Sequence, residues 1–204
     1  MEESKEHAIL IAAIHEFAVK GYAQASTNQI AQSAGASKGL IFHYYGYKEK
    51  LFEESVNYAL DFSMKALDFK KWDLSDDLME KLKGYCEQEL LFCKNYPDFY
   101  QLIVQAFTRP PKQLTDKMGR LFKDLQLMVP QFINQMINAL DLKDDVDTKT
   151  LQHVLFSHYQ YYSSQAMDHL KKHPETTIDE LRPFINQYLA MNAMSLRGLQ
   201  KHDK

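Results

Sequence analysis

Two segments with helix-start signals, separated by a glycine, most constrain what this chain can fold into. They lie in the stretch STNQIAQSAGASKGLIFHYYGYKEKLF, Ser26 to Phe52. Ser26 is followed three residues later by Gln29, which is the pattern of a capping box at a helix N-terminus. Gly35 is expected to end that helix, and Ser37 to cap the next one. The spacing therefore predicts two short helices joined by a tight turn.

Helical periodicity also extends upstream of this stretch. Leu10, Ala13, Ile14 and Phe17 recur at the spacing of one buried helical stripe. A helix is therefore predicted from about residue 4 to residue 20, with Gly21 at its C-terminal cap. The whole chain has only seven Gly and six Pro in 204 residues, too few for a fold rich in hairpin turns.

Breaks in the pattern divide the rest of the chain into further helices. A fourth helix is expected to begin at Lys48. Prolines mark boundaries at 95–99 and 108–111, because the residue before a proline is disfavoured in the helical region. Pro130 predicts a kink or a stop. Loops are expected at 70–77, which contains Trp72, and at 141–148 and 171–180. We predict an all-α fold of about nine helices.

The net charge and the two cysteines indicate how the protein could bind nucleic acid and in which cellular compartment it is expected. The net charge is −3, so nucleic-acid binding would need a local positive patch, such as Lys38, Lys48 and Lys50. Cys86 and Cys93 would lie about 10 Å apart along a helix, too far for a disulfide, and we expect buried thiols in a reducing compartment. No apolar run is long enough to span a membrane, and the acidic N-terminus does not resemble a signal peptide. A cytoplasmic protein is expected.

A pair of short helices with a glycine-bearing turn is typical of a helix-turn-helix, whose second helix enters the major groove of DNA. An ordinary corner between two helices has the same pattern. The spacing alone leaves both interpretations open.

The residues around this turn resemble the DNA-binding domain of the TetR family of transcriptional regulators, over about residues 6–53. The resemblance rests on Ala12, Ala13, Phe17, Gly21, Tyr22, Ile30, Ala31, Ala34, Gly35, Ser37, Gly39, the aromatic run, Lys48 and Leu51. It implies a homodimer in which residues 1–53 form a three-helix DNA-binding domain and helix 4, from about residue 48, is a connector. Residues 54–204 would then bind a ligand and dimerise through the last two helices, at about 147–172 and 178–200.

The resemblance also implies which residues contact a double-stranded DNA operator. Two serve as phosphate ligands before the turn, three begin the recognition helix, and the others reach bases or phosphates further along. In chain order these residues are Ser26, Thr27, Ser37, Lys38, Gly39, His43, Tyr44, Tyr47 and Lys48. Phe42 stands where the family usually has a phosphate-bonding tyrosine, and we expect its ring to lie in the core.

Methionine and aromatic residues are frequent between residues 61 and 162. They are expected to line a pocket for a small apolar or aromatic effector, although ordinary core packing produces the same pattern. The candidate contacts are Phe99, Ile103, Phe107, Phe122 and Tyr159. No cofactor and no metal site is expected, since His169 and His173 share a helix face without an apparent third ligand.

Together these features predict a ligand-responsive transcriptional regulator, a repressor that a small molecule releases from a palindromic operator. One alternative is a member of the same family that organises DNA or docks another protein without small-molecule control. A remote alternative is an all-α metalloenzyme. It lacks support because the chain has no Glu-x-x-His on a core face and no Gly-x-Ser-x-Gly, so no enzymatic activity is expected.

Overall fold

The computed structural model describes residues 4–67 and 78–201 of the chain. In these ranges it contains α-helices, short 3₁₀ turns and a single isolated bridge, but no β-strand. The all-α prediction is confirmed. The expected break at 70–77, with Trp72, lies outside the described residues.

The chain forms two compact units, each assembled from two separate parts of the sequence. The first consists of Met1–Asp68 and Phe92–Arg120, and the second of Phe69–Leu91 and Leu121–Lys204. Two helices, α5 (Leu78–Asn95) and α7 (Thr115–Gln126), therefore begin in one unit and end in the other.

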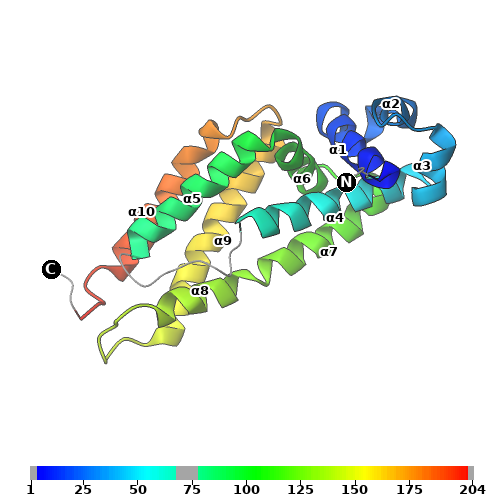
Figure 1. Ribbon diagram of the computed structural model, residues 1–204. Coiled ribbons are helices and arrows are strands. Elements are labelled where there is room, and N and C mark those ends of the chain that lie inside the picture. The colour runs from blue at the N-terminus through cyan, green and yellow to red at the C-terminus, as the bar shows by residue number, and fades with distance from the viewer. Residues whose placement is uncertain (1–3, 68–77, 202–204) are drawn as a thin grey trace. The chain divides into compact units, whose positions relative to one another are not determined.

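The first unit is built around the N-terminal helix (Figure 1). It contains α1 (Lys5–Gln24), α2 (Thr27–Ser33), α3 (Lys38–Tyr45), α4 (Lys48–Leu67) and α6 (Pro97–Thr108). Helix α1 packs against all four of the others, and α4 also packs against α6. The rings of Phe17 and Phe52 meet edge to face at 5.1 Å between α1 and α4, and both side chains are fully buried.

The predicted caps hold α2 and α3 in place. The Ser37 hydroxyl accepts a hydrogen bond from the Leu40 N–H at 3.2 Å, and the Ser26 hydroxyl accepts one from Gln29 at 3.5 Å. The reciprocal half of the Ser26 cap comes from another helix. Glu16 of α1 accepts the Ser26 N–H at 3.0 Å, the role that the capping box predicted for Gln29.

Glycines with positive φ mark the ends of the first helices. Gly35 has φ +57° in the turn between α2 and α3, and Gly21 has φ +69°. Helical structure nevertheless resumes after Gly21 and reaches Gln24, so α1 is longer than predicted and kinked at this glycine.

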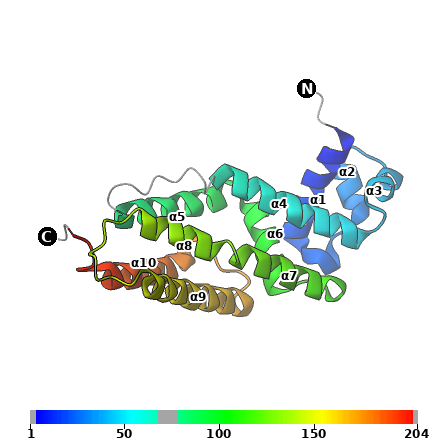
Figure 2. The same ribbon diagram turned by 90° about the horizontal axis from the view of Figure 1, so that it is seen from below.

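The second unit packs α9 (Thr148–Lys172) against α8 (Val129–Asn138) and α10 (Arg182–Leu196), as Figure 2 shows. Asp147 caps α9 by accepting hydrogen bonds from the backbone N–H groups of two residues in its first turn. The buried core of the unit comprises Leu78, Leu82, Ile133, Met136, Ile137, Leu151, Leu155, Tyr188 and Leu196.

Several boundaries of the second unit refine the predictions. Pro130 lies in the first turn of α8, after α7 has stopped at Gln126, so this proline marks a helix start. The last helix begins at Arg182, later than predicted, after a 3₁₀ turn at Asp179–Leu181.

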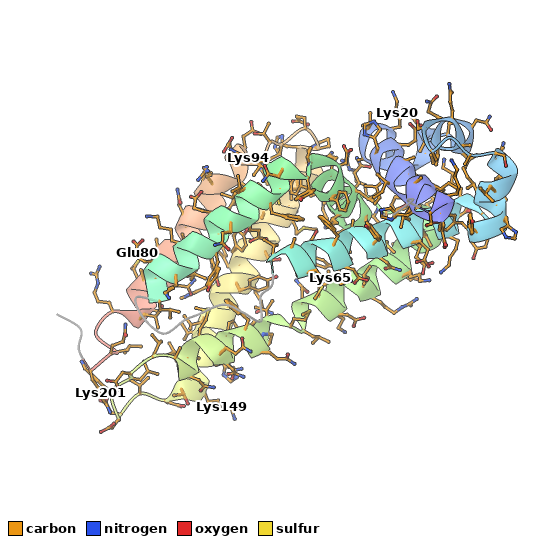
Figure 3. All side chains as sticks on the ribbon, in the orientation of Figure 1. Lys20, Lys65, Glu80, Lys94, Lys149 and Lys201 are labelled. Carbon is orange, nitrogen blue, oxygen red and sulfur yellow. The ribbon has the colours of Figure 1, made fainter. Side chains whose placement is uncertain are left out.

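Most charged side chains lie on the outside of the two units (Figure 3), whereas Glu16 and Glu53 are buried. The labelled residues Lys20, Lys65, Glu80, Lys94, Lys149 and Lys201 are all exposed. This distribution leaves the helix contacts to the apolar side chains, as expected for packed amphipathic helices.

Cys86 and Cys93 are free thiols, as predicted, but they are half-buried rather than buried. Burial raises the pKa of the Cys86 thiol to about 12, which keeps it protonated at neutral pH. No helix in the described part of the chain is long and apolar enough to cross a membrane.

Candidate nucleic-acid interface

Helix α3 has one anchored face and one exposed face. Ile41 and Tyr45, four residues apart, are 1% and 7% exposed and form the anchored face. Lys38, His43 and Tyr44 are exposed. The helix therefore presents a cation, an imidazole and a phenol to the outside while its backbone is held by the core.

Tyr45 fixes α3 to α1 and was not singled out by the sequence analysis. Its hydroxyl donates a hydrogen bond to the backbone carbonyl of Glu6 at 3.2 Å. Burial, with help from nearby carboxylates, raises the pKa of Tyr45 to about 12. The signal that would have identified it is its spacing from Ile41, which places both residues on one helical stripe.

The prediction that Phe42 lies in the core is wrong. Phe42 is 40% exposed, and the Lys38 ammonium lies 5.9 Å from the centre of its ring. The physical reason is helical phase: Ile41 and Tyr45 take the inward stripe, and Phe42 falls on the flank beside it. Phe42 therefore joins the exposed face of α3.

Ser37 and Gly39 form the start of α3. Both are exposed, and the Ser37 side chain caps the helix. A Cβ built on Gly39 would meet only the Ser37 hydroxyl oxygen, at 3.8 Å, which is an ordinary contact. The protein itself therefore does not require a glycine at this position.

Ser26 and Thr27 begin α2 and are half-buried. The Ser26 hydroxyl oxygen is engaged by the Gln29 N–H, which leaves the hydroxyl hydrogen available to an outside acceptor. Both residues lie where they were predicted, at the N-terminus of the first helix of the pair.

Lys48 opens α4, as predicted, and lies over an aromatic ring. Its ammonium is 4.7 Å from the centre of the Tyr22 ring. Desolvation lowers the pKa of Lys48, against the opposing effect of Glu49 and Glu16. Next to it, Tyr47 is 59% exposed, so a phenol and an ammonium lie side by side at the end of α3.

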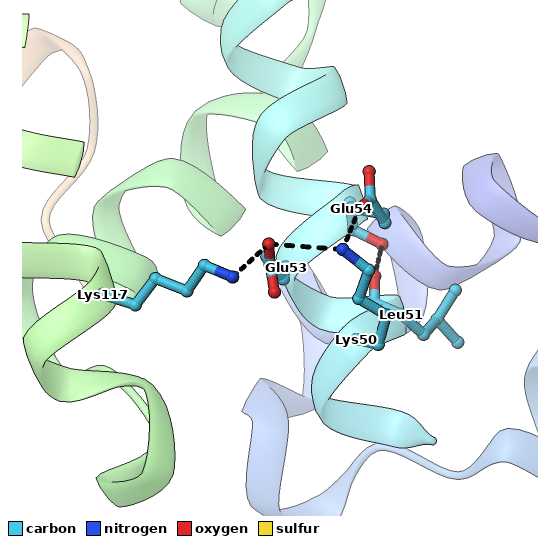
Figure 4. A network of polar contacts seen from close by, with 6 residues as sticks. Lys50, Leu51, Glu53, Glu54 and Lys117 are labelled. Carbon is cyan, nitrogen blue, oxygen red and sulfur yellow. Dashed lines mark hydrogen bonds and ion pairs between the residues drawn. The ribbon is translucent and has the colours of Figure 1, made fainter. Parts of the chain in front are cut away.

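Lys50, the third lysine of the predicted patch, is used within the protein. Its ammonium bridges Glu54 at 2.5 Å and Glu53 at 3.4 Å (Figure 4). Glu53 is buried and also pairs with Lys117 of α7 at 2.5 Å. Of the three lysines of the predicted patch, Lys38 and Lys48 therefore remain available to a partner.

The five candidate effector contacts fall in different units. Phe99, Ile103 and Phe107 lie on α6 in the first unit and are half-buried. The Phe99 ring contacts the rings of Tyr58, Phe62 and Tyr96 at centroid distances of 6.2, 4.9 and 5.9 Å.

The remaining candidates, Phe122 of α7 and Tyr159 of α9, belong to the second unit and are also half-buried. The two histidines with helical spacing, His169 and His173, have ring centres 4.7 Å apart. The described residues contain no group of three or more His, Cys, Asp or Glu that could hold a metal ion.

Comparison with known proteins agrees with this geometry. Residues 9–55 match the family model described as "Bacterial regulatory proteins, tetR family". The chain is 27% identical over 122 residues to the HTH-type transcriptional regulator RutR of Escherichia coli O157:H7, covering 60% of this chain and 57% of that protein. It is 46% identical over 46 residues to the HTH-type transcriptional repressor AcnR of Corynebacterium jeikeium (strain K411), covering 22% and 24%. The alignments thus span less than two thirds of either relative.

The fold has solved counterparts. A TetR-like transcriptional regulator from Rhodococcus sp. RHA1 superposes with a TM-score of 0.60 over 97% of each chain, at 18% sequence identity. That likeness concerns the fold, while the match of residues 9–55 concerns the helix-turn-helix itself. Residues 9–55 are thus similar to the tetR family of bacterial regulatory proteins, and the fold of the chain is that of a TetR-like regulator of known structure.

Proposed function

We propose that this protein is a ligand-responsive transcriptional regulator, a homodimeric repressor that a small molecule releases from a palindromic operator. The observation that carries the proposal is the exposed face of α3. Lys38, Phe42, His43 and Tyr44 point outward from a helix whose other side is anchored by Ile41 and Tyr45. A short, rigid helix with this division suits insertion into the major groove.

The side chains on α3 differ in what they offer to DNA. The Lys38 ammonium is suited to the acceptors of guanine, and the exposed ring of Phe42 to a thymine methyl group. Lys48 and Tyr47, at the opposite end of α3 from Ser37, are placed to contact the phosphate backbone. The first group would give sequence preference, and the second would hold the helix in register.

Exposed apolar side chains on α9 and α10 support the homodimer. Val154 and Tyr161, seven residues apart on α9, are 36% and 45% exposed, and Met194 of α10 is 74% exposed. Between the two helices, the His158 ring bonds Asn192 at 3.2 Å, and Asn192 is fully buried. Helices α9 and α10 thus pack against each other and expose apolar residues. This arrangement suits a four-helix contact with the same two helices of a second copy.

A buried hydroxyl on α6 supports an effector site. The Tyr100 hydroxyl oxygen is buried and has no hydrogen-bond partner among the described residues. An unsatisfied buried polar group costs about 1–3 kcal/mol, so a ligand that bonds to it would gain affinity. Tyr100 directly follows Phe99, one of the predicted contacts.

Release from the operator would then be a shift between two populations of the dimer. Half-sites of a palindrome lie about 34 Å apart, and the two recognition helices must match that spacing. Helix α4 is suited to transmit the change, because it begins beside α3 at Lys48 and is tied to α7 through Glu53 and Lys117.

The test is selection of the purified protein against random duplex DNA at near-physiological salt. We expect enrichment of a palindrome, with two half-sites about one helical turn apart. Lys38→Ala should relax the preference at one base of each half-site, whereas Lys65→Ala, a change at an exposed residue near the other end of α4, should leave the motif unchanged. A folded, dimeric protein that enriches no motif would contradict the proposal and support an architectural role.

A further inference from the structure

The first turn of α1 is held by its own cap and by a contact with α4. The Ser4 hydroxyl caps the helix by accepting a hydrogen bond from the His7 N–H at 3.2 Å. The His7 ring meets the Tyr58 ring of α4 edge to face, with ring centres 5.4 Å apart. The other groups of this turn therefore extend from a fixed base.

Lys5, in this first turn, reaches the turn between α2 and α3. Its ammonium donates a hydrogen bond to the Gly35 carbonyl at 3.2 Å, although the two residues are 30 positions apart in the sequence. Helix α2 has no basic residue in its own last turn. A cation near the C-terminus of a helix is stabilising, because the carbonyl ends of the peptide dipoles are negative. Lys5 supplies this cation to α2 from another helix.

The turn that Lys5 contacts sets the angle between α2 and α3. Gly35 has φ +57°, and its N–H donates to the Gln32 carbonyl at 3.1 Å. The Ala36 N–H donates to the Ala31 carbonyl at 2.9 Å, so the last turn of α2 is closed by the residues that follow it. The bond from Lys5 holds the carbonyl that lies between these two N–H groups and the start of α3.

The opposite end of α3 is tied to the same turn of α1. The Tyr45 hydroxyl donates to the backbone carbonyl of Glu6 at 3.2 Å, and Glu6 is the neighbour of Lys5. Gly35 lies just before α3, and Tyr45 is its last residue. The Lys5–Gly35 and Tyr45–Glu6 hydrogen bonds are called the α1 clasp below.

A clasp at both ends matters because α3 is short. Its eight residues, Lys38–Tyr45, are too few to form a stable helix alone, so its orientation depends on contacts with other helices. A single bond would leave the helix free to pivot, whereas bonds at both ends resist tilting as well. Reading of base edges requires hydrogen-bond geometry, which tolerates little misalignment of the helix.

We propose that Lys5 and Tyr45 are positioning residues for recognition helix α3, and that the α1 clasp they form sets its specificity for the operator. The inference deepens the proposed function, on which it rests. Lys5 acts through the Gly35 carbonyl and not through a DNA phosphate.

The first test measures DNA binding by two variants of the full chain. Tyr45→Phe keeps the ring, and Lys5→Met keeps an unbranched stem. Each should lower affinity for the selected palindrome by about five- to thirty-fold, since base contacts weaken in both half-sites. Affinity for random duplex DNA and the slope of log K against log salt should match wild type, because no phosphate contact is removed. Lys5→Arg retains a donor for the carbonyl and should restore operator affinity.

The second test needs no DNA. Amide hydrogen exchange of α3, followed by mass spectrometry, should become about two- to ten-fold faster in each variant, as expected for the loss of one hydrogen bond. The melting temperature should stay within about 4 °C of wild type. Lys65→Met removes the same charge from an exposed position of α4 and should change neither measurement.

Three results would overturn the inference. An equal loss of affinity for all DNA, with a salt slope shallower by about 0.9, would make Lys5 a phosphate contact. Wild-type exchange of α3, or full operator affinity, in either folded variant would show that the clasp does not position the helix. A larger fall in melting temperature would assign the two bonds to the stability of the whole unit.

The two tests also separate this inference from the proposed function. If the wild-type protein enriches a palindrome and the variants behave as wild type does, the inference fails while the regulator remains. If no palindrome is enriched, the regulatory role fails, and the exchange of α3 in the two variants still decides whether the clasp holds the helix.

Discussion

At the scale of single residues, the structure of the protein does not require glycine at position 39. A Cβ at this position would make only an ordinary contact with Ser37, and alanine is favoured over glycine inside a helix by about 1 kcal/mol. We expect Gly39→Ala to leave the free energy of unfolding unchanged or slightly higher. It should weaken operator binding by at least about ten-fold, because the added methyl group holds the backbone of α3 away from the DNA.

Urea denaturation and a binding titration on the selected palindrome measure the two effects separately. Gly84→Ala is the matched control, since a Cβ there meets open space and lies on α5, outside the proposed DNA-binding helices. Tight operator binding by Gly39→Ala would show that α3 does not approach DNA closely at this residue.

Lys48 is expected to contact a phosphate and not a base. Lys48→Ala should reduce affinity for all DNA sequences by a similar factor. It should also make the dependence of log K on log salt shallower by about 0.9 for each phosphate that the side chain no longer neutralises. Titrations at several salt concentrations provide the slope, with Lys65→Ala as a control. A selective loss of affinity for the palindrome alone would instead assign Lys48 a role in base recognition.

The sequence pattern did not predict which of the aromatic residues of α3, such as Phe42 and Tyr45, would be buried. The aromatic run of α3 suggested that these rings contribute to the core or to DNA contacts, but adjacent positions on a helix differ by about 100°. Only the packing of α1 against α3 selects Tyr45, whose hydroxyl reaches the Glu6 carbonyl, for the inward face. Phe42 is left exposed for the same reason.

At the scale of helices, the contact between α4 and α7 depends on one buried carboxylate. Burial acts to raise the pKa of Glu53, but hydrogen bonds and charges from Lys117 and Lys50 outweigh it and hold the pKa below its ordinary value. A depressed carboxyl pKa in the folded state means that stability is present above the unfolded pKa of about 4.5 and disappears as pH falls through the folded value.

We therefore expect Glu53→Gln to lower the free energy of unfolding by about 1–2 kcal/mol at pH 7. The difference from wild type should shrink as pH falls from the unfolded value of about 4.5 through the lower folded pKa, where Glu53 itself becomes protonated. Denaturation curves at pH 7 and in acid test this. Glu54→Gln removes a more exposed partner of Lys50 and should cost less. A difference that persists undiminished in acid would show that the ion pairs do not provide the stability.

Helix boundaries could be predicted where the chain itself enforces them. Serine caps, positive-φ glycines and prolines act within a few residues, so the starts of α2, α3, α4, α6 and α9 agree closely with the sequence analysis. The exceptions need contacts from further away. The cap of α2 is completed by Glu16 from α1, which no local pattern indicated.

At the scale of the whole molecule, the proposed dimer relies on the outward faces of α9 and α10. Met194 of α10 is 74% exposed. Met194→Asp would place a charge in the proposed apolar interface, where a charge is costly, and should therefore shift the protein from dimer to monomer. Binding to the palindrome should fall towards the weaker affinity of a single half-site. Analytical ultracentrifugation and a binding titration provide the two measurements.

Leu127→Asp is the matched control, since Leu127 is 61% exposed but lies in the turn directly after α7. It should remain dimeric. A dimeric Met194→Asp variant would place the interface elsewhere on the molecule.

The sequence by itself determined the all-α class, the capped helix pair and the lysines and small residues expected at its ends, because these depend on propensities and caps that act over a few residues. Tertiary structure alone decided the rest: which rings of α3 face outward, that Tyr45 reaches the Glu6 carbonyl, and that Glu53 of α4 pairs with Lys117 of α7. These outcomes join residues distant in the sequence. Packing and desolvation depend on which helices meet, and local patterns carry no information about that.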